Sequence, residues 1–83
     1  MKIRKEIKWF AEQMEKVLRQ NDDKGGWEKT SKKYLSYQLG ENFHQLQANM
    51  LGVIYSSPLH LVKCCVDIAN YCMMIADNEK NGR

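Results

Sequence analysis

The chain has 83 residues, of which 28% are charged and 43% belong to the hydrophobic class, and its formal net charge is +3. This balance argues against disorder and against a membrane protein, and the length allows a single domain, residues 1–83. The apolar runs are too short to cross a bilayer and the charged N-terminus is unlike a secretory signal, so we expect a cytoplasmic protein without a membrane partner.

Nucleic acid is not an expected partner, because the positive charge is modest and neither a recognition-helix turn nor an arginine-rich stripe is visible. The three cysteines, Cys64, Cys65 and Cys72, lack paired metal spacing. We expect reduced, mostly buried thiols.

The first segment is predicted to be an amphipathic helix of about five turns that ends near Gln20. Its apolar residues recur at three- and four-residue steps: Ile3, Ile7, Phe10, Met14, Val17 and Leu18. The hinge that follows, NDDKGGWEK from Asn21 to Lys29, favours turns, since Asn and Asp prefer caps and Gly25-Gly26 is costly to hold in a helix.

Two further helices are predicted after the hinge. The second begins at Thr30 or Ser31, either of which could cap it, and carries a core-facing stripe. That stripe consists of Leu35, Leu39, Phe43, Leu46 and Met50. The pattern breaks at residues 55–58, where Ser57 is a natural N-cap and Pro58 suits a first helical turn.

The third helix is predicted from Leu59 to about Asp77, followed by a frayed polar tail at residues 78–83. It is apolar on most sides, and two helices of the same short chain can cover only part of it. The fold class is therefore all-α: a helix, the KGGW hinge and an antiparallel helical hairpin that pack against another copy of the chain.

Two sequence segments together resemble a phage and bacterial branch of the MazG-like all-α nucleotide pyrophosphohydrolases. They are FAEQMEKVLRQNDDKGGW near the start and VDIANYCMMIADN near the end. The resemblance covers Phe10 to Asn78. It implies an oligomeric helical bundle built from dimers or tetramers, a Mg²⁺ cofactor, and hydrolysis of nucleoside triphosphates to monophosphate and pyrophosphate.

The resemblance also implies a metal site made of ExxE on one helix and ExxD on a later one, which fall on residues 42–45 and 64–67. Three of the four expected acids are instead Asn42, Gln45 and Cys64. Neutral amides and a soft thiol are poor partners for Mg²⁺, which prefers carboxylate oxygens. This substitution argues against a hydrolytic two-metal site.

The remaining acids at this site are Asp67 and, just before the first motif, Glu41. If a metal binds, these two are the expected ligands. A register shifted by one pairs Glu41 with His44, and His44, Cys64 and Asp67 would then suit a transition metal. No catalytic residue is predicted, and no cofactor is expected unless a Mg²⁺-dependent activity survives.

The nucleotide-binding residues implied by this alignment are Lys24, Gly25, Gly26, Trp27, Glu41, Asn42, Gln45, Asp67 and Asn70. Amides can read base edges or ribose hydroxyls without repelling phosphates, although a polar seam between subunits would also use them. Trp27 either stacks on a base, with Lys24 on a phosphate, or closes the end of the bundle.

Three functions stay open. The first is a non-catalytic nucleotide-binding protein, which in phage would sequester a nucleotide second messenger of host antiviral defence in the host cytoplasm. The second is a Mg²⁺-dependent pyrophosphohydrolase, weak or active. The third is a helical adaptor whose partner is another protein.

Overall fold

A computed structural model describes residues 1–54 and 57–83 of the chain. Its elements in order are α1 (Lys5–Gln20), a short 3-10 helix η1 (Asp22–Lys24), α2 (Lys32–Met50) and α3 (Pro58–Lys80). The described ranges contain helices and turns and no strand, which confirms the all-α fold class.

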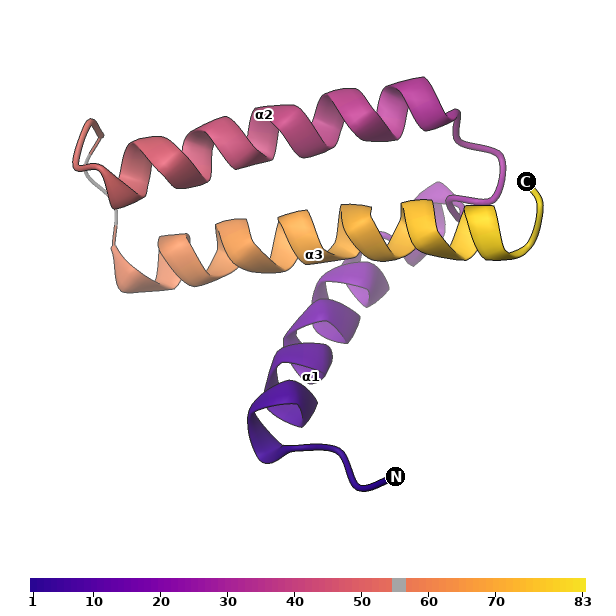
Figure 1. Ribbon diagram of the computed structural model, residues 1–83, viewed down its shortest axis with the longest axis horizontal. Coiled ribbons are helices and arrows are strands. Elements are labelled where there is room, and N and C mark those ends of the chain that lie inside the picture. The colour runs from indigo at the N-terminus through magenta and orange to yellow at the C-terminus, as the bar shows by residue number, and fades with distance from the viewer. Residues whose placement is uncertain (55–56) are drawn as a thin grey trace.

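The helices are arranged around α3. Figure 1 shows α2 and α3 side by side and running in opposite directions, whereas α1 crosses α3 and projects away from α2. Both α1 and α2 pack on α3, and the backbones of α1 and α2 do not approach each other closely in the part of the chain that the structure describes. The hinge connects the C-terminal end of α1 to the N-terminal end of α2 (Figure 1).

The two predicted N-caps are confirmed. The Ser31 hydroxyl accepts a hydrogen bond from the backbone N–H of Tyr34 at 3.1 Å, and the Ser57 hydroxyl accepts one from that of His60 at 3.2 Å. Each bond satisfies one of the backbone donors that a helix start leaves unpaired. Pro58 occupies the first turn of α3, whereas Tyr55 and Ser56, where the break was expected, lie outside the described residues.

Two helix boundaries differ from expectation. α1 begins at Lys5, so Ile3 precedes it; the N-cap residue Arg4 has an extended backbone and provides no side-chain cap. α3 continues to Lys80, where a frayed tail was expected. There Asn78 is 8% exposed and donates from Nδ2 to the Trp27 carbonyl at 3.1 Å, a tertiary contact that helical periodicity does not reveal.

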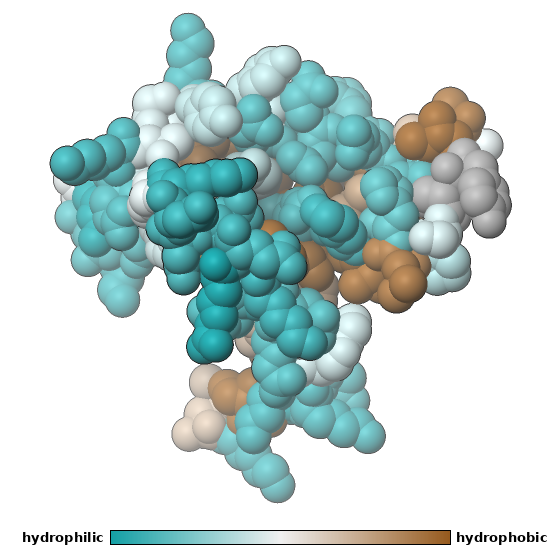
Figure 2. All heavy atoms as spheres, turned by 180° about the vertical axis from the view of Figure 1, so that it is seen from behind, coloured by the Kyte–Doolittle hydropathy of each residue, from teal (hydrophilic) through white to brown (hydrophobic). Residues whose placement is uncertain are grey.

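The core of the single chain is small. Among the described residues, the buried hydrophobic side chains are Leu35, Cys64 and Val66. The α2 stripe is only partly covered, since Phe43 is 47% exposed and Met50 69%. Figure 2 shows apolar residues at the surface in two places, beside the loop that follows α2 and near the start of α1.

α3 is long enough and apolar enough to cross a membrane, judged by length and composition alone. This differs from the sequence-based expectation that no segment could span a bilayer. The core helix of a soluble protein passes the same test, so the finding adds no argument for a membrane location.

Candidate functional site

The hinge turns the chain between α1 and α2 by means of one glycine. α1 ends at Gln20, and a single 3-10 turn, Asp22–Lys24, follows it. Gly25 then adopts φ 87° and ψ 171°, a backbone conformation that side-chain-bearing residues rarely take. This reversal brings the segment after it back towards α3.

Trp27 fixes the hinge to the end of α3. Its indole Nε1 donates to Asp77 Oδ2 at 2.9 Å, and Arg83 Nη1 donates to the same oxygen at 2.9 Å. The indole N–H, followed by the guanidinium, holds the pKa of the Asp77 carboxyl below its ordinary value. This geometry supports the interpretation in which Trp27 closes the end of the bundle, and it positions the hinge as one wall of a cleft.

The cleft lies between the hinge, α1, α2 and α3 and has a volume of about 660 Å³. This volume falls within the roughly 300–1,000 Å³ typical of small-molecule sites. From α1 and the hinge side it is lined by Val17, Leu18, Gln20, Asn21, Asp22, Lys24, Gly25, Gly26, Trp27 and Thr30. From α2 and α3 it is lined by Tyr34, Leu35, Asn42, Lys63, Asp67, Asn70, Tyr71 and Met74.

Seven of the nine residues predicted for a nucleotide site line this one cleft. The other two, Glu41 and Gln45, are exposed and are not among its lining residues. Glu41 precedes Asn42 by one position, which turns it about 100° away around α2. Gln45 lies nearly a turn further along α2, away from the hinge that forms the cleft wall.

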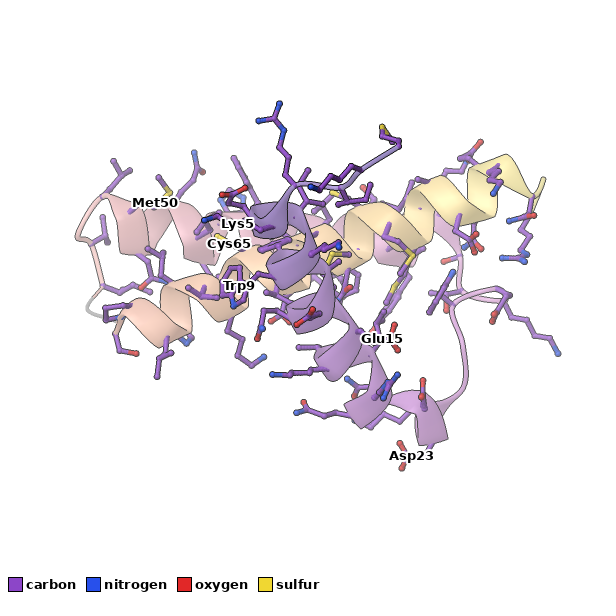
Figure 3. All side chains as sticks on the ribbon, turned by 90° about the horizontal axis from the view of Figure 1, so that it is seen from below. Lys5, Trp9, Glu15, Asp23, Met50 and Cys65 are labelled. Carbon is purple, nitrogen blue, oxygen red and sulfur yellow. The ribbon has the colours of Figure 1, made fainter. Side chains whose placement is uncertain are left out.

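The charges in the cleft balance. Lys24 and Lys63 are opposed by Asp22 and Asp67, and Lys63 Nζ lies 3.2 Å from Asp67 Oδ2. That pairing partly neutralises the one motif acid that remains. Lys24 forms no ion pair within residues 1–54 and 57–83, so its ammonium is available to an anionic group. Figure 3 shows Asp23, next to Lys24, pointing away from the helices.

Amides and phenols supply the neutral polar groups of the cleft. Asn42 Nδ2 donates to the Gln38 carbonyl of its own helix at 2.8 Å, and Asn70 Nδ2 donates to the Met14 carbonyl of α1 at 3.3 Å. Tyr71 has a raised pKa, because burial disfavours its phenolate and the nearby Tyr34 and Asp67 add to the effect. A tyrosine hydroxyl is protonated at neutral pH at its ordinary pKa of about 10, and the raised pKa of Tyr71 keeps it a donor at still higher pH.

The metal ligands considered from the sequence do not assemble. No group of three His, Cys, Asp or Glu side chains in the described part of the chain is placed to hold a metal ion. This corrects the hypothesis of a transition-metal site at His44, Cys64 and Asp67. The Nε2 atom of His60 lies 3.7 Å from the buried Cys64 Sγ, since these two residues are four apart on one helix.

Magnesium ligation by the motif positions also does not fit this chain. Glu41 lies outside the cleft, and Asp67 is paired with Lys63. Mg²⁺ is bound mainly through carboxylate and phosphate oxygens, so a site with one engaged carboxylate offers it little charge.

Among the lining side chains that sequence reasoning did not assign to the site, Lys63, Tyr34 and Tyr71 are the ones with polar groups on α2 and α3. Helical spacing could have found two of them. Lys63 precedes Asp67 by four residues and Tyr71 follows it by four, so all three share one face of α3. The partnership of Trp27 with Asp77 had no sequence signal, because fifty residues separate them.

Comparison with known proteins found no matching protein-family model, no matching curated protein and no matching solved structure. The MazG-like resemblance stays a prediction.

Proposed function

We propose that the chain binds a nucleotide or a nucleotide-derived signal molecule in the cleft and releases it uncleaved. The observation that carries this proposal is the convergence of Lys24, the Gly25-Gly26 backbone, Trp27 and two carboxamides on one cleft of suitable volume. A nucleotide needs an aromatic or apolar surface for its base, hydrogen-bonding groups for its edge and a cation for its phosphate. The cleft provides each of these.

The phosphate and the base of such a ligand can be assigned to different walls of the cleft. The Lys24 ammonium and the Gly26 backbone N–H suit a phosphate, since neither needs a metal to attract an anion, whereas the Gly25 N–H already donates to the Asp22 carbonyl at 3.3 Å. The Trp27 and Tyr34 rings offer surfaces for a base. Because the Trp27 N–H is already bound to Asp77, the indole can contribute its ring and not its donor.

The absence of cleavage is part of the proposal and follows from the donor set. Hydrolysis of a triphosphate by the MazG-like route needs divalent ions held by several carboxylates. Here the motif positions carry Asn42, Gln45 and Cys64, and the remaining Asp67 is engaged by Lys63. With a MazG-like fold of phage origin, such a binder would act against host antiviral defence by sequestering a nucleotide second messenger in the host cytoplasm.

A homo-oligomer, a dimer or tetramer, is the proposed working form. The accessible surface of the chain is 6697 Å², whereas a compact monomer of its mass of 9.8 kDa is expected to expose about 5,200 Å². The excess, on the order of 1,500 Å², is larger than the roughly 800 Å² that each partner buries in a standard interface. A second copy would cover this surplus.

The binding proposal is tested with a panel of nucleoside mono- and triphosphates and cyclic dinucleotides, with and without Mg²⁺. Calorimetry reports binding and chromatography of the mixture reports cleavage. We expect at least one nucleotide to bind and to be recovered unchanged. Robust turnover with Mg²⁺ would replace the proposal by the pyrophosphohydrolase. If the panel shows no binding and no turnover, the proposal is overturned and the adaptor function is the one left.

A matched pair of hinge variants locates the site. Lys24→Ala removes the cleft ammonium and should weaken binding about tenfold or more, since a charge-assisted bond contributes roughly 1.5–3 kcal/mol. Lys29→Ala removes another exposed hinge lysine, one that does not line the cleft, and the affinity should not change. Equal losses in both variants would indicate nonspecific attraction to the basic hinge.

A further inference from the structure

Asn70 presents a buried oxygen that nothing in the described chain satisfies. The side chain is 4% exposed and lines the cleft from α3. Its Nδ2 donates to the Met14 carbonyl at 3.3 Å, while Oδ1 is buried without a hydrogen-bond partner. A carbonyl can only accept, so the amide must turn its NH₂ group to Met14, and this fixes Oδ1 as the free atom.

An unpaired carbonyl oxygen in a buried place is costly, and a donor from a bound molecule would remove that cost. Oδ1 itself has almost no accessible surface, so a ligand donor reaches it only when a side chain of the cleft wall moves aside. The aliphatic side chains of Val17, Leu18 and Met74 line the same cleft. A flat heteroaromatic ring can lie against such groups, whereas an ionised phosphate cannot and carries no donor at neutral pH.

We propose that Asn70 Oδ1 accepts a hydrogen bond from an exocyclic amino group of the ligand's base, so that the cleft selects amino-bearing nucleotides. This inference rests on the proposed nucleotide binding. Asn70 acts as a specificity-determining residue, and its NH₂ group, held by α1, keeps the acceptor in place. Lys24, on the hinge, attracts the phosphate end of the same molecule.

The test uses two ligand pairs that differ only in the amino group. Adenosine 5′-monophosphate is compared with purine riboside 5′-monophosphate, and cytidine 5′-monophosphate with its 4-deamino analogue. Affinities of the full chain are measured by calorimetry at pH 7. In each pair that binds, we expect the analogue without the amine to bind about tenfold more weakly or worse, because the Asn70 oxygen is then left unpaired.

Two asparagine variants assign the effect to its source. Asn70→Leu removes the acceptor, and the ratio of affinities within a ligand pair should fall to about one. Asn49 is a matched control, because its Oδ1 is also buried without a partner but it lies outside the cleft, between α2 and α3. Asn49→Leu should leave the ratio as in the parent chain.

The outcomes distinguish failure of the proposed role of Asn70 from failure of the proposed nucleotide binding. Equal affinity for both members of every pair that binds, or a preference that survives Asn70→Leu, overturns the role of Asn70 and leaves nucleotide binding standing. Failure of all four nucleotides and of the wider panel to bind overturns the proposed function itself. If Asn70→Leu does not fold, as circular dichroism would show, the ligand pairs decide the question alone.

Discussion

The carboxylate of Asp77 joins two parts of the chain that are far apart in sequence. It accepts hydrogen bonds from the Trp27 indole in the hinge and from Arg83 at the C-terminus, each at 2.9 Å. Both partners interact more strongly with the ionised carboxyl, so its pKa is lower in the folded chain than in the unfolded one. The proton must therefore bind more tightly to the unfolded chain, which links stability to pH.

Acid should weaken the fold through this residue. The contribution of Asp77 is fully present above the ordinary aspartate pKa of about 3.9 and is lost as the pH falls through the lower folded value. Thermal melts followed by circular dichroism from pH 7 to pH 2.5 should show this loss. Asp77→Asn keeps an oxygen for Trp27 but cannot titrate, so its melting temperature should be lower at pH 7 and fall less steeply in acid.

Asp23→Asn is the control for this titration, because Asp23 is exposed and forms no ion pair in the described part of the chain. Its pH profile should follow that of the parent chain. If Asp77→Asn and the parent lose stability in parallel between pH 5 and pH 2.5, another carboxyl governs the acid transition.

At the residue level, the sequence predicted which side chains can bind a ligand better than it predicted which of them lie together. Lys24, Trp27 and Asn70 were selected for what their side chains can bind, and the structure places all three on one cleft. Gln45 was selected by the same reasoning and lies outside it. The difference comes from the crossing of α1 over α3 and the path of the hinge, which decide how far the cleft extends along α2.

Among the elements, the hinge needs its glycine at position 25 for the backbone conformation, whereas α2 does not need its glycine at position 40. Gly25 has φ 87° and ψ 171°, a conformation that L-residues rarely adopt, so Gly25→Ala should destabilise the chain by about 1–3 kcal/mol. Gly40 lies inside α2, where an added Cβ would meet no atom within 4 Å. Gly40→Ala should stabilise α2 by about 0.5–1 kcal/mol, since alanine loses less entropy in a helix.

Urea unfolding of both variants, followed by circular dichroism at one protein concentration, measures these opposite changes. A Gly25→Ala variant as stable as the parent would show that the hinge tolerates another path. A destabilised Gly40→Ala variant would show that a neighbouring copy packs closely against α2 at that position, since the single chain leaves the space open.

The start of a helix could be predicted where a local hydrogen bond decides it. The end of a helix could not be predicted where a tertiary contact decides it. Ser31 and Ser57 each bond a backbone N–H three residues ahead, which sequence chemistry anticipates. The end of α3 depends on Asn78, whose side chain bonds the Trp27 carbonyl across fifty-one positions. No pattern of three or four residues carries that information.

For the whole molecule, the single chain leaves its helices incompletely covered. Its radius of gyration is 13.9 Å, against about 11.8 Å expected for a compact domain of 83 residues. α1 contains no buried residue although it has a pronounced apolar face. The periodicity of the sequence predicted such faces, but it does not say which are covered within the chain and which by another copy.

The start of α1 is where the proposed assembly can be tested. Figure 3 shows Lys5 and Trp9 near the free end of α1, and the side chains of Ile7 and Trp9 are 55% and 50% exposed. If a second copy covers them, Ile7→Glu would bury a charge and should lower the mass measured by light scattering from that of an oligomer to that of a monomer. In an isolated chain the same exposed position would change stability by only about 0.5 kcal/mol.

Lys16→Glu, on the exposed face of the same helix, is the matched control and should leave the mass unchanged. The melting temperature of the parent should also rise with protein concentration, because association stabilises only the folded chain, and that dependence should disappear in Ile7→Glu. A parent chain that is fully helical and monomeric at tens of micromolar would contradict the assembly. The half-exposed faces of α1 and α3 would then be stable in water without a second copy.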